Sequence, residues 1–441
     1  MEPKIFPVIF TKEAFQLCNN PQYRSFSSVL RRELIPALGC TEPIAIAFAA
    51  AKAREVLGAV PDHMEMLCSG NIIKNVKGVT VPNSGGICGV EIAAVLGVVG
   101  GNATRELEVL EEITPEHITQ AQRLIKDGFF RYSLAEEVEN LYIAATVFAG
   151  NESAKVTIIN RHTLITEIEK NGKIIYKHNP VDRTINTDWS MWSIKEILDF
   201  ADNADISPVA NILRRQIDLN TAIASEGMNH LYGAQVGRTL LSCGDEDVRT
   251  RAKAYAAAGS DARMGGCSLP VVINSGSGNQ GITVSLPVMA YAEKLDVPEE
   301  KLLRAMALSN LVAIYQKHYI GSLSAFCGAV TAACGSGAAI TYLCGGDYDA
   351  ICRTIINTIA NVGGIICDGA KASCAAKIAS SVDAAITAHT MSMRGLCFHN
   401  GEGIVKSDIE ETIRSMGYVG RGGMKETDVQ ILHLMMNQIE L

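Results

Sequence analysis

Four cysteines in the last third of the chain fall in two short segments that contain glycine. Cys327 and Cys334 lie in SAFCGAVTAACGSG, and Cys367 and Cys374 lie in GGIICDGAKASC. Thiolates bind soft metals, but these spacings match neither the C-x-x-C pairs of zinc sites nor the close cysteine runs of ferredoxins. Taken alone, the pair in CDGAKASC is compatible with core packing, with a disulfide or with part of a metal site.

The geometry of that pair limits the kind of metal group that the two thiols could bind. One continuous helix over 367–374 would separate its terminal Cα atoms by roughly 10 Å along the axis, too far for two thiolates to share one small ion. The surrounding glycines instead predict that Cys367 precedes a helix, with Asp368 as a cap and Cys374 one or two turns inside. Thiols so placed could hold a larger group, such as an iron–sulfur cluster, and a helix start stabilises thiolates.

The composition favours free thiols over a disulfide framework. The chain of 441 residues has 13 cysteines, and its N-terminus lacks a basic region followed by an apolar one, so we expect a cytoplasmic protein without a secretory signal. Most of these cysteines should be buried as small apolar side chains. The formal net charge is −8 and no basic block stands out, so we expect no nucleic-acid partner.

A long uncharged stretch at 319–346 has to be considered as a membrane-spanning segment. It is long enough to span a bilayer, but it is poor in large aliphatic residues and rich in Gly, Ala and Ser. This composition favours a closely packed pair of buried helices, interrupted at Gly335-Ser336-Gly337. We therefore expect no membrane partner.

The motif GSGNQG at 276–281 follows a strand-like segment, LPVVIN, and precedes a helical one. This order suits a dinucleotide-binding loop, but the next element is helical, so no βαβ unit closes and we reject NAD. Exposed backbone N–H groups and a helix N-terminus can still bind a small anion, such as an amino-acid carboxylate or the phosphate of pyridoxal phosphate. A tight turn without a ligand is the alternative interpretation.

The hydrophobic periodicity predicts how the chain is organised. Residues 26–57 have the pattern of two helices broken near Cys40, with Thr41 as the N-cap of the second and Pro43 in its first turn. Runs with alternating polarity follow between about 60 and 185. Asn171-Gly172 separates two of them, which is the signature of a β-hairpin.

From Trp189 onward, helical spacing dominates. We therefore predict an α+β protein with a large, mainly helical domain and a smaller α/β module inserted near the N-terminus. The predicted helical domain consists of 1–58 and 190–441, and the inserted module of 59–189.

Several motifs resemble one known family. They are GCTEP at 39–43, NSGSGNQGI at 274–282, NTIANVGGIICDGAKASCAAKI at 357–378 and GMKETDVQILHLM at 423–435. In these motifs the chain is similar to the L-cysteine desulfidase family, which belongs to the α-chain family of iron–sulfur L-serine dehydratases in the wider sense. The resemblance covers nearly the whole chain, and a neighbouring subgroup of bacterial proteins shares it. Members carry a 4Fe–4S cluster on three cysteines, with one iron free for substrate, and split L-cysteine into pyruvate, ammonia and sulfide.

The resemblance implies a role for four of the cysteines. Cys327, Cys367 and Cys374 would bind the 4Fe–4S cluster, and Cys40 would be the catalytic base. The helix start after Cys40 favours its thiolate, whereas the adjacent Glu42 opposes it. Since Cys40 must then lie beside the cluster, the N-terminal helices are expected to pack into the C-terminal helical domain.

The expected partner is a small amino acid, and the apolar helical surface is compatible with a homodimer. Four residues of the GSGNQG region are candidates to orient the substrate: Asn274, Ser275, Ser277 and Asn279. His318 is the best candidate among the histidines, because it begins the uncharged stretch that leads to Cys327. His230, His399 and Cys334 are expected to be structural, and 83–86 to form a turn.

The expected reaction is β-elimination by a carbon–sulfur lyase acting on L-cysteine. An iron–sulfur L-serine or L-threonine dehydratase is the nearest alternative, because the same ligands serve both. A pyridoxal phosphate enzyme with Lys371 as its Schiff base, and a cluster-bearing sensor without catalysis, are the other two.

Overall fold

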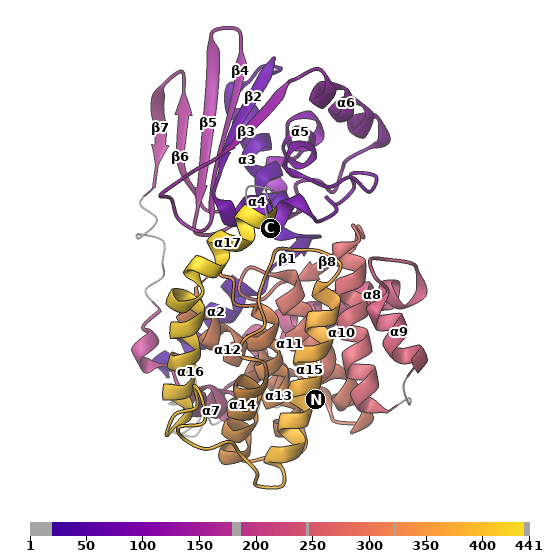
Figure 1. The fold of residues 1–441 in the computed structure, drawn as a ribbon, viewed down its shortest axis with the longest axis vertical. Helices are drawn as coiled ribbons and strands as arrows, with labels where there is room; N and C mark the ends of the chain where they lie inside the picture. Colours follow the sequence, from indigo (N-terminus) through magenta and orange to yellow (C-terminus); the bar gives the residue numbers. More distant parts are fainter. Residues whose placement is uncertain (1–19, 179–186, 244–246, 322, 436–441) are drawn as a thin grey trace, which may run out of the picture.

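The computed structural model shows a sheet layer that lies against a larger helical body (Figure 1). It describes residues 20–178, 187–243, 247–321 and 323–435. Helices predominate, and the main sheet is built from the N-terminal part of the chain. The predicted α+β class is therefore confirmed.

The main sheet has six strands in the order β3-β2-β4-β5-β6-β7, in which only β2 and β3 run parallel. In β2 the side chains alternate between buried and exposed, so one face of the strand is packed and the other is open. Asn171 and Gly172 both have positive φ, 53° and 72°, and join β6 to β7 as the predicted hairpin. The strands are β2 (His63–Cys68), β3 (Phe130–Leu134), β4 (Tyr142–Ala149), β5 (Glu152–Ile159), β6 (Ile165–Lys170) and β7 (Lys173–Lys177).

Helices cover the packed face of this sheet. The Ala-rich α3 (Thr41–Leu57) packs on β4 and β5 and against α5 (Val90–Gly100), which in turn contacts α6 (Pro115–Lys126). Gly97 permits the α3–α5 contact, because a Cβ there would lie 2.3 Å from the carbonyl oxygen of Ala47. Although α3 thus lies with the strands, the predicted boundary between 58 and 59 stays a prediction.

The helical body gathers around α13 (Gly328–Leu343), which packs against α11 (Gly278–Lys294), α12 (Glu299–Ile320), α14 (Tyr348–Val362) and α15 (Cys374–Ser392). The expected interruption at Gly335-Ser336-Gly337 is wrong, because α13 runs through it without a break. These small residues instead allow helices to touch, since a Cβ on Gly335 would meet the carbonyl oxygen of Ser309 at 2.3 Å. No helix in the described ranges combines the length and apolar character that crossing a bilayer requires.

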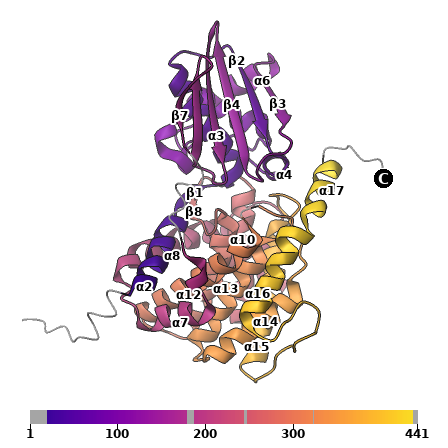
Figure 2. The ribbon, with the colours of Figure 1, turned by 90° about the vertical axis from the view of Figure 1, so that its left-hand side faces the viewer.

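The helices of this body come from both ends of the chain. They are α2 (Pro21–Glu33), α7 (Ile194–Asn203), α8 (Ser207–Asn229), α9 (Val236–Cys243), α10 (Val248–Met264), α11 (Gly278–Lys294), α12 (Glu299–Ile320), α13 (Gly328–Leu343), α14 (Tyr348–Val362), α15 (Cys374–Ser392) and α16 (Ile409–Tyr418). Figure 2 shows the body below the sheet layer, with α2 against it.

Two connections join the layers. Strands β1 (Pro36–Leu38) and β8 (Pro270–Val272) pair antiparallel at the junction. Helix α17 (Lys425–Met435) reaches from the helical body to α4 (Gly70–Lys77) of the sheet layer (Figure 2). There Asp428 forms an ion pair with the fully buried Lys74. Residues far apart in the sequence therefore meet at this junction.

Candidate active site

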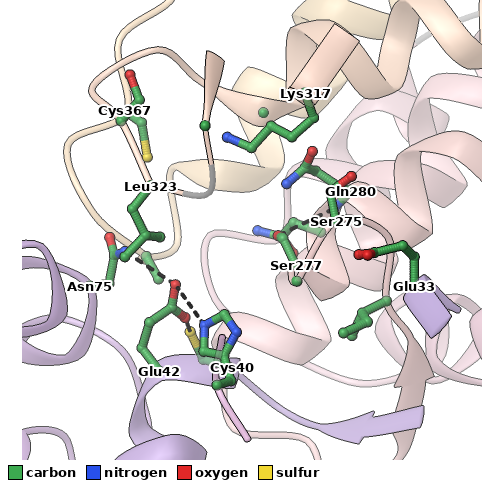
Figure 3. A pocket seen from close by; sticks show the side chains of 18 of the residues that line it. Glu33, Cys40, Glu42, Asn75, Ser275, Ser277, Gln280, Lys317, Leu323 and Cys367 are labelled. Atoms are coloured by element: carbon green, nitrogen blue, oxygen red, sulfur yellow. Dashed lines mark hydrogen bonds and ion pairs between the residues drawn. The ribbon is translucent and has the colours of Figure 1, made fainter. Parts of the chain in front are cut away.

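A cavity of about 530 Å³ lies where the sheet layer meets the helical body (Figure 3). Four helices begin at its wall. Cys40, Ser277 and Cys327 are the N-cap residues of α3, α11 and α13, and Cys374 is the first residue of α15. Helix N-termini present unpaired N–H groups and a partial positive charge. Their convergence favours a ligand with negative charge.

The predicted cluster ligands Cys327, Cys367 and Cys374 all line this cavity. Two backbone hydrogen bonds fix the first two side by side: the N–H of Cys327 donates to Ile365 O at 3.0 Å, and that of Cys367 donates to Ala325 O at 2.6 Å. The prediction for the third was wrong in detail, because Cys374 begins α15 instead of lying one or two turns inside it, and Asp368 does not cap it. A helix start at Cys374 turns its thiol toward the loop carbonyl of Gly369, 3.7 Å away.

The three thiols do not form a site for a single metal ion among the described residues. Within the described residues, no three His, Cys, Asp or Glu side chains approach closely enough to bind a single metal ion. Burial raises the pKa of Cys327 to about 12, and the nearby Cys367 adds to this effect. Such thiols stay protonated without metal, whereas a bound metal deprotonates its thiol ligands.

Lysines surround the three thiols. Lys74 Nζ lies 3.5 Å from the carbonyl oxygen of Cys367, Lys377 Nζ donates to Ile366 O at 2.9 Å, and Lys371 pairs with Asp368 at 2.5 Å. Asp368 pairs with Lys371 and Lys377, and Asp428 pairs with Lys74, so one net positive charge of this group is left to offset thiolates. Three separate thiols, one cavity and a cationic surround therefore fit the predicted 4Fe–4S cluster.

Cys40 lies in the same cavity, although its helix α3 belongs with the sheet. The predicted N-cap, Thr41, is off by one position, because Cys40 is the N-cap and its carbonyl accepts from Ile44 N–H. The Cys40 side chain packs with Val79 and Met264, and Cys374 lies against this group. The predicted base and one predicted cluster ligand are therefore neighbours.

The surroundings of Cys40 oppose its ionisation. The thiol is buried and donates to Glu42 Oε2, with 3.0 Å between sulfur and oxygen. Burial, and then the charge of Glu42, raise the pKa of Cys40 well above its usual value. The backbone N–H of Glu42, at the helix start on which the sequence-based argument for a thiolate relied, lowers the pKa of Cys40 less than burial and the Glu42 charge raise it.

Glu42 is the centre of a buried polar network. Its Oε2 also accepts from Thr41 Oγ1 at 3.1 Å, and its Oε1 accepts from Asn75 Nδ2 at 3.2 Å. His162 Nε2, from the β5–β6 loop, lies 3.8 Å from the same Oε1. Burial alone would raise the pKa of Glu42, but His162 and weaker neighbours lower it to about 2. The carboxyl group is therefore ionised.

The structure divides the four predicted substrate-binding residues. Ser275, Ser277 and Asn279 line the cavity, but Asn274 does not. Asn274 is fully buried, and its Nδ2 donates to Asn310 Oδ1 at 2.9 Å. Asn274 instead fixes the conformation of the loop, because its Oδ1 accepts a hydrogen bond from Ser275 Oγ at 2.9 Å. Ser275 has a left-handed φ of 50°. The buried Oδ1 of Asn279 has no partner among the described residues.

Lys317 is one of the site residues that the sequence-based reasoning missed, together with Asn75, His162 and Gln280. Its side chain reaches into the cavity between Cys367 and Gln280 (Figure 3), is only 7% exposed, and makes no hydrogen bond or ion pair within the described part of the chain. Burial lowers the pKa of Lys317, while Cys367 and Cys327 counteract this effect. A lysine in the mainly apolar run LVAIYQKHYI was the available signal. Buried ammonium groups usually have a partner, so this one marks a binding position.

The remaining candidates divide between the cavity and the rest of the fold. His318 lines the cavity and stacks on Trp189 with ring centroids 4.0 Å apart. Cys334 is buried in α13, away from the cavity wall. His230 pairs with Glu226 at the exposed end of α8. The 12 cysteines that the structure describes are all free thiols, as the composition predicted.

The comparisons with known proteins show the family to which the chain belongs. Residues 104–433 match the model of the serine dehydratase alpha chain family, so the chain belongs to that family. The family is one of amino-acid dehydratase-type lyases and depends in general on iron–sulfur clusters.

Close relatives match along almost their whole length. A UPF0597 protein of Lachnoclostridium phytofermentans is 53% identical over 416 residues, which is 94% of this chain and 100% of the relative. A UPF0597 protein of Desulfitobacterium hafniense is 50% identical over 94% of this chain and 97% of its own length. A UPF0597 protein of Treponema denticola is 45% identical over 94% of this chain and 98% of its own length.

Proposed function

We propose that this protein is an iron–sulfur-dependent L-cysteine desulfidase, which eliminates sulfide from L-cysteine and yields pyruvate and ammonia. The observation that carries the proposal is that Cys327, Cys367 and Cys374 open on one cavity, with Cys40 packed against the third of them. The three thiols would hold a 4Fe–4S cluster, which supplies a Lewis-acid iron for the sulfur that leaves the substrate.

The polar groups of the cavity suit both ends of an amino acid. The N–H groups at the start of α11 provide positive charge for the α-carboxylate, as does the ammonium of Lys317, which has no partner among the described residues. The buried amide oxygens of Asn279 and Gln280, which have no partner within the described residues, can accept hydrogen bonds from the α-ammonium group. These contacts would hold the Cα–H bond in one direction.

In the proposed reaction, Cys40 removes the α-proton. The proton moves from Cα to Cys40 Sγ, the Cα–H electron pair forms the double bond, and the Cβ–S bond breaks. The resulting 2-aminoacrylate is hydrolysed in water to pyruvate and ammonia. Since Cys40 is a thiol at rest, it must first lose its own proton.

An L-serine or L-threonine dehydratase is the second candidate, because the family match points to it. The same residues would orient a hydroxyl substrate, and water would leave in place of sulfide. A soft thiol prefers an iron–sulfur centre more than a hydroxyl does, which favours L-cysteine.

The test is an anaerobic comparison of L-cysteine, L-serine and L-threonine with the iron-reconstituted protein, in which pyruvate or 2-oxobutyrate, ammonia and sulfide are measured. We expect sulfide and pyruvate in equal amounts from L-cysteine and a lower kcat/KM for the other two. Cys367→Ala should abolish turnover, and Cys334→Ala, in the helix that begins after Cys327, should keep it. Higher kcat/KM with L-serine or L-threonine would select the dehydratase, and turnover in Cys367→Ala would refute the site.

A further inference from the structure

Besides Lys317, a second buried cation lines the cavity without a carboxylate partner among the described residues. Arg263, near the end of α10, is only 2% exposed. Its Nε donates to Gly39 O at 2.8 Å, but its two Nη groups make no hydrogen bond within the part of the chain that the structure describes. Arginine is rarely buried without a partner, because a desolvated charge is costly. The unused Nη groups therefore mark a position for an anion.

Arg263 lies where the start of α11 meets the segment that leads to Cys40. A Cβ on Gly278, the first residue of α11, would lie only 2.8 Å from Arg263 Cζ, so the guanidinium rests on the first turn of that helix. The carbonyl that accepts from its Nε belongs to Gly39, which directly precedes Cys40. The guanidinium and the positive end of α11 are therefore combined beside Cys40.

The carboxylate of Glu42 does not neutralise Arg263 by direct contact. The charge of Arg263 helps to lower the pKa of Glu42, but the two side chains form no ion pair. The Glu42 oxygens accept hydrogen bonds from Cys40, Thr41 and Asn75 instead. The two Nη groups are left for a carboxylate that a ligand brings, and their planar arrangement matches the two oxygens of such a group.

We propose that Arg263 binds the α-carboxylate of the amino-acid substrate through two parallel hydrogen bonds from its Nη groups, an inference that rests on the proposed function. Since Cα is bonded directly to the carboxylate carbon, a carboxylate held beside Cys40 brings the Cα–H bond toward that residue. The Cβ substituent can then extend toward the cluster thiols, which line the same cavity. Lys317, a single point charge on α12, adds attraction but does not fix the plane of the carboxylate. Arg263 therefore determines the orientation of the substrate.

The test compares the binding of an amino acid with that of its amide. L-Alanine has no leaving group at Cβ, so its binding to the cluster-loaded protein is measured by anaerobic calorimetry without turnover. L-Alaninamide replaces the carboxylate by a neutral amide. Wild type should prefer L-alanine, and Arg263→Met should reduce this preference by about 100-fold, because two charge-assisted hydrogen bonds are lost. The loss should fall on L-alanine alone, whereas a general disturbance of the cavity would weaken both ligands.

A second variant keeps the positive charge and removes the paired Nη groups. Arg263→Lys should lose about tenfold of the preference, and its kcat with L-cysteine should fall about tenfold, because one ammonium does not fix the carboxylate plane. Arg353→Met, on α14 and away from the cavity wall, is the matched control and should leave the preference and kcat unchanged.

The possible results separate this inference from the proposed function. An unchanged preference for L-alanine in either Arg263 variant would overturn the inference, and release of sulfide and pyruvate from L-cysteine by wild type would still support the proposed function. A reduced preference in Arg263→Met, in a protein whose wild type releases neither pyruvate nor 2-oxobutyrate, would support carboxylate binding by Arg263 and refute the proposed function.

Discussion

The backbone N–H of Cys367 donates to the carbonyl oxygen of Ala325 across a contact of 2.6 Å. Together with the bond from Cys327 to Ile365, it joins the loop before α13 to the loop that leads to α15. Two predicted cluster ligands are therefore held by backbone geometry and not by their side chains. A change of either thiol should remove a ligand without dismantling the loops.

Iron binding tests whether Cys327, Cys367 and Cys374 are the cluster ligands. Cys327→Ala, Cys367→Ala and Cys374→Ala should each lose most of the iron and the broad visible absorbance after anaerobic reconstitution, while far-UV circular dichroism stays unchanged. Cys334→Ala should keep its iron, because that thiol does not line the cavity. Full iron content in all three ligand variants would contradict the assignment.

Lys317 should lower the stability of the fold and strengthen binding of the amino-acid substrate. Lys317→Met removes a buried ammonium that has no partner within the described residues, so the free energy of unfolding in urea should rise. The KM for the amino acid should increase by about 10- to 100-fold, as expected for loss of one charge-assisted hydrogen bond. Lys301→Met, near the start of the same helix, should leave KM unchanged. Equal KM values in the two variants would exclude Lys317 from the substrate site.

Gly369 lies in the loop between Cys367 and Cys374, at a position where a side chain does not fit. Its φ of 94° and a Cβ position only 2.5 Å from the carbonyl oxygen of Lys74 leave no room for a side chain. Gly369→Ala should lower the free energy of unfolding by more than the ~1–2 kcal/mol of backbone strain alone, and should lower iron content. Gly395→Ala is the control, since φ there is 75° but a Cβ at this position would meet no atom of another segment within 4 Å. Similar losses in both variants would mean that the contact with Lys74 is unimportant.

Glu42 should also affect stability in acid. Its pKa is about 2 in the folded protein, below the ordinary value of 4.5, so the folded state favours the ionised form. This stabilisation is complete above about pH 4.5 and is lost as the pH falls toward 2. The two pKa values correspond to roughly 3 kcal/mol. The difference in unfolding free energy between wild type and Glu42→Gln should therefore shrink over this range, and a difference independent of pH would contradict the assigned ionisation.

Local patterns were sufficient for the parts of the fold that depend on neighbours in sequence. Asn171-Gly172 predicted its hairpin because few other residues adopt positive φ at two successive positions. Pro43 predicted the start of α3, although Thr41 misplaced its cap by one residue. The glycines around Cys367 correctly indicated a loop before a helix, but not that the helix begins at Cys374.

The candidate site depends on contacts between distant segments, which no local pattern contains. The sequence determined the α+β class, the thiols and, by resemblance, their expected roles, because residue types and motifs are local properties. Only the tertiary structure decided that Cys40 is buried against an ionised Glu42, that Asn274 fixes the conformation of the loop, and that Lys317 reaches the cavity. Burial and the charge of distant neighbours set the protonation of Cys40, and both arise only when the sheet layer and the helical body meet.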